Sequence, residues 1–166
     1  MNAKLKTLVG VAIATTFVGL AFATPQKKVV APILAVGTNA NDIEVHGVAK
    51  NADGRTFRVS LETEGPTSIT TSLGAYASGG QNGWHLHPGM VIVTLTKGSV
   101  QWYDANCKLT VYNAGDSWME GSRTHYLRVL GASAAQFVTT FIVAEGQANR
   151  IDQAAPACAA ALDLND

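Results

Sequence analysis

The sequence predicts an all-β domain, a sandwich or barrel of short strands. Runs that alternate apolar and polar residues, such as 57–62, indicate half-buried strands. Turn residues separate these runs at regular spacing, and no segment before the C-terminal tail shows a sustained helical period. The length of 166 residues suits one domain. The expected strands are 57–62, 68–73, 91–96, 99–103, 108–112, 117–119, 126–130 and 136–143.

The first 23 residues show the three-part pattern of a signal peptide. Lys4 and Lys6 precede an uncharged, largely apolar run at 7–22, and small residues stand where signal peptidase cleaves. An uncleaved anchor is the alternative, but this run of 16 residues is short for a membrane span. We expect cleavage after Ala23, export to the periplasm or the medium, and no membrane association afterwards.

The mature chain is expected to form one domain with a segment on each side. An N-terminal arm or linker covers 24–41, the β-barrel domain covers 42–145, and a short Ala-rich tail covers 146–166. The apolar run at 29–36 contains Pro32, which an edge strand tolerates.

Charge and motifs exclude several classes of function. Removal of Lys4 and Lys6 leaves 10 basic against 12 acidic residues, a net charge of −2. No basic cluster could neutralise several phosphates, so nucleic acid is not an expected partner. The sequence also has no Gly-x-Ser-x-Gly elbow, no phosphate-binding loop and no His-Glu-x-x-His helix.

Two cysteines, Cys107 and Cys158, are the only ones in the chain. Export to an oxidising compartment would let them pair, and two free thiols are the alternative. The bond would join the tail to the domain across about 50 residues, which is worth roughly 4 kcal/mol in the chain-entropy model. Neither has a Cys or His neighbour at the spacing of a metal site.

A pair of histidines, His85 and His87, precedes the expected strand at 91–96. On an extended backbone residues i and i+2 point to the same face, so both rings can share a metal ion. His125 opens a later strand, 38 residues beyond His87, which an antiparallel barrel can bring beside the first. Three converging imidazoles suit a divalent transition metal with positions open for water or substrate. His46 has no motif around it and is expected to be a hydrogen-bonded structural residue.

The residues around the histidine pair resemble the first motif of the cupin superfamily. The positions that match at the family spacing are Gly79, His85, His87 and Gly98. The family usually has a glutamate ligand at the position of Val91, so that carboxylate is missing. Gly115, Gly121 and His125 resemble the second motif, with Gly121 in place of the usual proline and a loop that is one residue shorter.

The resemblance implies a cupin jelly-roll β-barrel, similar to the small single-domain (type-2-like) cupins that bacteria export. It implies that His85, His87 and His125 hold a divalent transition metal: iron, manganese, nickel, copper or zinc. Cupins with three-histidine sites exist, the thiol dioxygenases among them. Glu120 could replace the missing carboxylate if the short loop turns it inward, although we expect a solvated residue at a strand end.

The resemblance leaves the activity open between two functions. One is a metal-dependent, dioxygenase-like oxidoreductase that acts on a small organic substrate. The alternative is a non-catalytic cupin that binds a small ligand and has lost its metal chemistry. Arg123 is a candidate to grip a substrate carboxylate, although an exposed loop cation is the commoner outcome. Trp84 and the other strand aromatics are expected mainly in the core, and one or two could line the pocket.

A third function stays open, that of a partner-binding domain whose barrel rim contacts another chain. Many cupins form homodimers through strands of the sheet, and a homodimer is a possible assembly here. The arm at 29–36 could exchange between subunits.

Overall fold

Strands dominate the chain, as the alternation of apolar and polar residues predicts. The computed structural model describes residues 23–164. Within this range eleven strands join in one antiparallel sheet, and two others pair only with each other. The elements are β1 (Lys27–Val30), β2 (Ile33–Asn39), β3 (Ile43–Lys50), β4 (Thr56–Thr63), β5 (Thr67–Gln81), β6 (His85–Leu86), β7 (Met90–Lys97), β8 (Ser99–Asp104), β9 (Leu109–Asn113), β10 (Ser117–Glu120), β11 (His125–Val129), β12 (Ala135–Ala144), β13 (Ile151–Asp152) and the 3₁₀ helix η1 (Ala157–Leu162).

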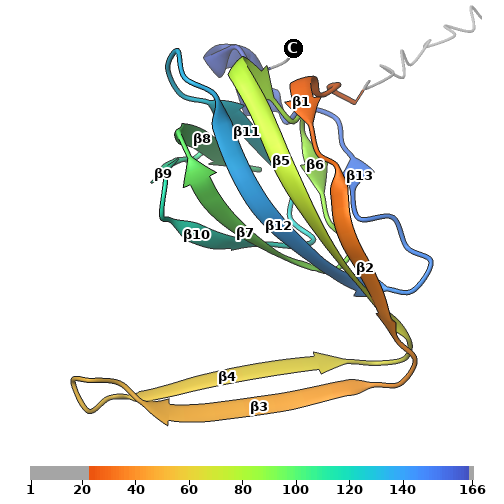
Figure 1. Ribbon diagram of the computed structural model, residues 1–166. Coiled ribbons are helices and arrows are strands. Elements are labelled where there is room, and N and C mark those ends of the chain that lie inside the picture. Colours follow the sequence, from red (N-terminus) through yellow and green to blue (C-terminus); the bar gives the residue numbers. More distant parts are fainter. Residues whose placement is uncertain (1–22, 165–166) are drawn as a thin grey trace, which may run out of the picture.

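The long strand β5 connects the two layers of the barrel. Ten of its residues pair with β12, and its last residue, Gln81, pairs with Arg128 of β11. One layer therefore contains β10, β7, β12 and β5, and the other contains β9, β8, β11, β6 and β13 (Figure 1). This nearly closed antiparallel arrangement confirms the predicted jelly-roll β-barrel.

The interior of the barrel follows directly from the two-residue period of β7. Val91, Val93 and Leu95 are buried, whereas the residues between them are partly exposed. They pack with side chains from β8, β10, β11 and β12 in one apolar cluster. The turn from β7 to β8 requires Gly98, because its φ of 81° is left-handed and a Cβ there would lie 2.6 Å from the Ala134 carbonyl oxygen.

The strand pairing runs across the predicted boundary between arm and domain at residue 41. β1 and β2 divide the apolar run at 29–36 between them, and both pair with β5. The expected arm is thus part of the barrel sheet. In contrast β3 and β4, which fall within the predicted barrel range, pair only with each other and project away from it (Figure 1). β3 has no counterpart among the strands predicted from sequence.

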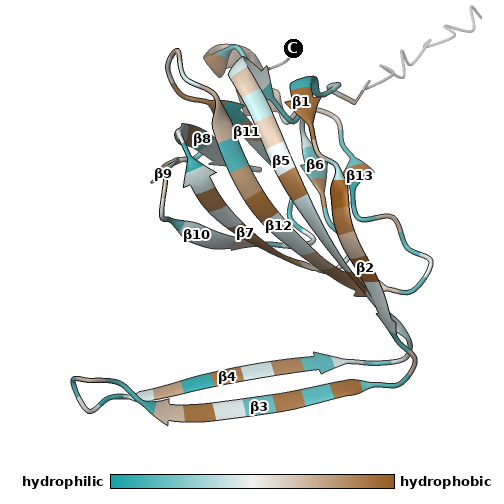
Figure 2. Cartoon of the chain, viewed as in Figure 1, coloured by the Kyte–Doolittle hydropathy of each residue, from teal (hydrophilic) through white to brown (hydrophobic). Residues whose placement is uncertain are grey.

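The projecting hairpin is amphipathic, with apolar and hydrophilic residues alternating along both strands (Figure 2). On one face the side chains of Val45, Phe57 and Val59 are 55%, 51% and 51% exposed. The opposite face carries Glu44 and Arg58 among other polar residues. An isolated two-stranded hairpin is marginally stable in water. The homodimer stays a prediction, and this apolar face is a surface through which it could form.

The C-terminal tail is attached to the barrel by a disulfide and a buried residue, in addition to the pairing of β13 with β6. Cys107, in the turn after β8, is disulfide-bonded to Cys158 in η1, which confirms the predicted pair. Leu164 is fully buried, and its carbonyl oxygen accepts a hydrogen bond of 2.9 Å from the indole of Trp84. The disulfide is consistent with export to an oxidising compartment.

The predicted signal peptide lies outside the described residues, apart from Ala23. Among residues 23–164, no helix has the length and apolar character needed to cross a membrane.

Candidate metal centre

The three predicted histidines come together because β6 and β11 pair in register. His125 of β11 lies directly opposite His85 of β6, and directly opposed residues of an antiparallel pair project to the same face. His87 follows two residues after His85 and projects to the same side. The ring centroids of His85 and His125 are 4.3 Å apart, and those of His87 lie 4.9 and 5.2 Å from them. All three side chains are buried.

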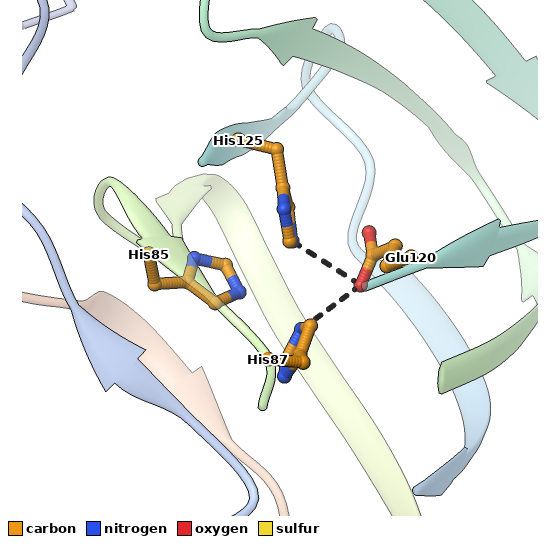
Figure 3. A group of neighbouring side chains, drawn as sticks. All are labelled: His85, His87, Glu120 and His125. Atoms are coloured by element: carbon orange, nitrogen blue, oxygen red, sulfur yellow. Dashed lines mark hydrogen bonds and ion pairs between the residues drawn. The ribbon is translucent and has the colours of Figure 1, made fainter. Parts of the chain in front are cut away.

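Glu120 joins this group from a neighbouring strand (Figure 3). Its Oε2 lies 3.2 Å from Nε2 of His87 and 3.3 Å from Nε2 of His125. The side chain is only 6% exposed, so the expectation of a solvated Glu120 is wrong. The reason is register: Glu120 ends β10 directly opposite Val91 of β7, whose side chain faces the interior. The carboxylate that is missing at Val91 is thus replaced from across the strand pair.

Two tryptophans determine how the Glu120 carboxylate is oriented. Its Oε1 accepts hydrogen bonds from the indole nitrogens of Trp102 at 3.0 Å and Trp118 at 2.8 Å. Oε2 is therefore the oxygen that faces the histidines. Burial acts to raise the pKa of Glu120, but interactions with His125, His87 and Trp118 outweigh it and hold this pKa well below 4.5. The carboxylate is consequently ionised inside the barrel.

Each histidine makes the same kind of hydrogen bond through its Nδ1. The acceptors for His85, His87 and His125 are the backbone carbonyls of Gly83, Asn149 and Arg123, at 2.8, 2.6 and 2.9 Å. A carbonyl oxygen can only accept, so every Nδ1 must carry the proton. In a neutral ring Nε2 then presents its lone pair. Such Nδ1–carbonyl bonds typically orient metal-bound histidines.

The resulting set of donors fits a metal ion. Three Nε2 atoms and one carboxylate oxygen lie within 4.8 Å of one another. Nε2 of His125 is buried and makes no hydrogen bond with any described residue. Bonds of about 2.0–2.2 Å to zinc place the ligand atoms of one ion roughly 3–4 Å apart, so a small closing movement suffices. Imidazole and carboxylate together suit a divalent transition metal.

Without a metal, protons must lie between these electron-pair donors, and the pKa values of the histidines shift in different directions. Burial acts to lower the pKa of His125, but the Glu120 carboxylate outweighs it and raises this pKa above 6.5. The pKa of His85 is well below 6.5, first because of burial and then because of positive charge on His125 and Arg150. A proton and a metal ion therefore compete mainly for His125, which lies beside Glu120.

A cavity of about 130 Å³ adjoins the candidate centre and is lined by three of its four residues, His85, His87 and Glu120. A buried apolar cavity of similar size holds a molecule such as benzene, so a ligand of a few heavy atoms can enter. Its walls come from β1, β5, β7, β10, β11 and β12 and from the loop before β13. The lining residues include Val29, Ala31, Tyr76, Val93, Phe137 and Phe141.

Two of the residues predicted near the site lie elsewhere. Trp84 is fully buried in a second apolar cluster with Tyr103, Tyr126 and Leu164, on the side of the tail. The side chain of Arg123 is exposed and does not line the cavity. Only its backbone reaches the site, through the hydrogen bond to His125.

Asn149 and Arg150 line the cavity from the loop between β12 and β13, and neither was predicted from the sequence. Asn149 supplies the carbonyl that orients His87. No spacing rule connects this irregular loop with the histidines, and the predicted boundaries placed it in the tail. This loop lies at the site because β13, which follows it, pairs with β6.

No protein-family profile matches this chain, and no curated protein matches it. Several solved structures are similar over part of their length. An oxalate oxidase is 23% identical over 46% of this chain and 46% of its own, with a TM-score of 0.39. An RmlC-like cupin from Shewanella frigidimarina is 16% identical over 47% and 68%, with a TM-score of 0.41. The Cnp3 cupin domain of Schizosaccharomyces pombe is 8% identical over 61% and 88%, with a TM-score of 0.43. The chain spans about half the length of the oxalate oxidase.

The nearly closed barrel with its buried histidines has the jelly-roll fold of the cupins. The jelly-roll pairing places the two sequence motifs on β6–β7 and β10–β11, where His85 and His125 lie opposite each other. The centre departs from the motif by one exchange, in which Glu120 provides the carboxylate that Val91 does not.

Proposed function

We propose that this protein is an exported metallo-cupin that uses a bound divalent transition metal to oxidise a small organic substrate with oxygen. One observation carries the proposal. Three Nε2 lone pairs and an ionised carboxylate oxygen converge inside the barrel, while every Nδ1 is already bonded to a carbonyl. Four electron-pair donors at such separation favour a cation between them.

The residues that would hold the metal are His85, His87, Glu120 and His125. One carboxylate among three neutral imidazoles leaves a divalent ion with a net charge of +1. Four protein ligands leave positions open on a metal that prefers five or six. A redox-active ion such as iron, manganese or copper supplies electron exchange with oxygen, whereas zinc does not.

The surrounding residues have separate tasks in this proposal. The backbone carbonyls fix the three imidazole rings, and Trp102 and Trp118 fix the carboxylate. The apolar walls formed by Val93, Phe137 and Phe141 exclude bulk water from the reacting groups. A small substrate is then held against the open side of the centre.

Metal analysis tests the proposal. The processed protein, purified without an affinity tag, is expected to contain close to one equivalent of transition metal by mass spectrometry. A His87→Ala variant should lose most of this metal, whereas His46→Ala should retain it. His46 is the matched control because it is exposed in the hairpin, bonded to Ser60 and Glu44.

The other outcomes of this measurement separate the functions. Metal that stays far below one equivalent after reconstitution would overturn the proposal and favour a cupin that only binds a small ligand. Oxygen consumption by the iron, manganese or copper form, with none by the zinc form, would support the oxidative reaction. Amino-terminal sequencing of exported protein should give Thr24 as the first residue.

A further inference from the structure

Arg150 is the cationic residue that lines the cavity beside the proposed metal centre. It lies in the loop between β12 and β13, one residue after the carbonyl that orients His87. Its side chain is 20% exposed, and its Nε donates a hydrogen bond of 2.5 Å to Asp152. Its Nη2 is buried and has no hydrogen-bond partner among residues 23–164. The Nε donor of the guanidinium is thus satisfied, whereas the Nη2 donor is not.

A buried donor without an acceptor is costly, by about 1–3 kcal/mol, and more when it is charged. Asp152 does not remove this cost, because its side chain is 55% exposed and it accepts from Nε, not from Nη2. The planar fork of a guanidinium matches the two oxygens of a carboxylate. The unpartnered Nη2 therefore indicates an acceptor that enters the cavity from outside.

The balance of charge around the cavity also favours an anion. Glu120 carries −1, the ion pair of Arg150 with Asp152 is neutral, and a bound divalent metal would add +2. The sum of +1 in a poorly solvated space attracts a negative ligand and repels a cationic one. Without the metal, the hydrogen-bonding capacity of Arg150 remains.

We propose that the ligand of this cavity is a small carboxylate that Arg150 grips through Nη2. The assignment rests on the proposed function for the position of the metal. The hydrogen bond between Arg150 and the ligand carboxylate does not require the metal. The volume of about 130 Å³ suits a ligand of a few carbons. Apolar walls at Val93, Phe137 and Phe141 suit a short, weakly polar body behind the carboxylate. Arg150 thus takes the role that the sequence suggested for Arg123.

Calorimetric titration tests this assignment with acetate, propionate and pyruvate as probes and acetamide as their neutral control. The zinc-loaded protein is used because it binds without oxidising its ligand. A charge-assisted hydrogen bond contributes about 1.5–3 kcal/mol. Arg150→Gln should therefore weaken the tightest probe by about ten- to hundredfold. Arg150→Lys keeps the charge without the fork and should fall between the two.

Arg58→Gln is the matched control, because it removes the same charge from an exposed side chain in the hairpin, which does not line the cavity. It should leave carboxylate affinity unchanged. Zinc content and thermal unfolding of each variant are measured in parallel, so a loss of fold or metal is distinguished from a loss of ligand contact. Equal binding of pyruvate by Arg150→Gln and the parent would overturn the assignment. Equal binding of acetamide and acetate by the parent would also do so.

The zinc content tests the proposed function separately from the carboxylate assignment. A parent that takes up no zinc would overturn the proposed function. Carboxylate binding to that same metal-free protein would still support the Arg150 contact if Arg150→Gln abolished it. A full zinc content together with no dependence on Arg150 would retain the metal centre and remove the carboxylate assignment.

Discussion

Substitution of Glu120 by glutamine is the most informative single change in this protein. It replaces one oxygen by an amide nitrogen and keeps the shape of the side chain. The two indole donors decide its orientation, because Trp102 and Trp118 both require an acceptor at the Oε1 position. The amide oxygen therefore takes that place, and the NH₂ group points at Nε2 of His87 and His125, which lie 3.2 and 3.3 Å from Oε2 in the parent.

The expected loss of metal affinity has two parts. The variant lacks the carboxylate, and removal even of a residue that only supports a ligand costs about 10- to 100-fold. Its NH₂ group also donates to two imidazole lone pairs, which must be released before metal binds. Two such bonds at about 1 kcal/mol each add roughly 30-fold. We expect zinc affinity to fall on the order of a thousandfold.

Stability of the metal-free protein gives the contrasting measurement. Glu120→Gln keeps both indole hydrogen bonds and should change the free energy of unfolding by about 1 kcal/mol or less. Glu120→Ala leaves two indole N–H groups without an acceptor, which costs about 1–3 kcal/mol each. The alanine variant should therefore be less stable by about 2–6 kcal/mol, measured by urea unfolding in the presence of chelator.

Competition with a chromophoric chelator measures the zinc affinity of the parent and both variants. An affinity of Glu120→Gln within threefold of the parent would show that Glu120 is not a ligand. Equal destabilisation by glutamine and alanine would refute the orientation imposed by the tryptophans.

Three further predictions concern pH, the disulfide and the hairpin. Zinc affinity should fall as the pH is lowered from a point above 6.5, because Glu120 raises the pKa of His125 despite the burial of this histidine. In Glu120→Gln the fall should begin at lower pH. Competition with a chelator at a series of pH values measures both. Substituting Cys107 and Cys158 by serine should remove roughly 4 kcal/mol of stability in urea unfolding but leave the zinc content unchanged, and an unaltered urea midpoint would contradict this. Replacing residues 43–63 by an Asn-Gly turn should preserve zinc affinity, because β3 and β4 pair only with each other, while sedimentation of both proteins tests whether the parent is a dimer through this hairpin.

Local pattern was sufficient for most of the barrel. The two-residue alternation in β7 and the turn glycines follow from the pleat and from left-handed backbone, which are properties of a few consecutive residues. The prediction for β5 was too short, because its second half is rich in glycine and small residues and pairs with β1 and β11 from distant parts of the chain. The propensities of residues within a strand do not indicate which distant strands it will pair with.

The candidate site divides in the same way. The sequence by itself determined the histidine pair, since His85 and His87 share a face through their spacing alone. It also limited any intrachain disulfide to Cys107–Cys158, because no other cysteine is available, and the structure showed that the bond forms. Tertiary structure alone decided that Glu120 turns inward opposite Val91, that Arg150 enters the cavity, and that Trp84 does not. Each of these depends on which strand lies beside which and in what register, and a shift of one residue would reverse the face of every side chain.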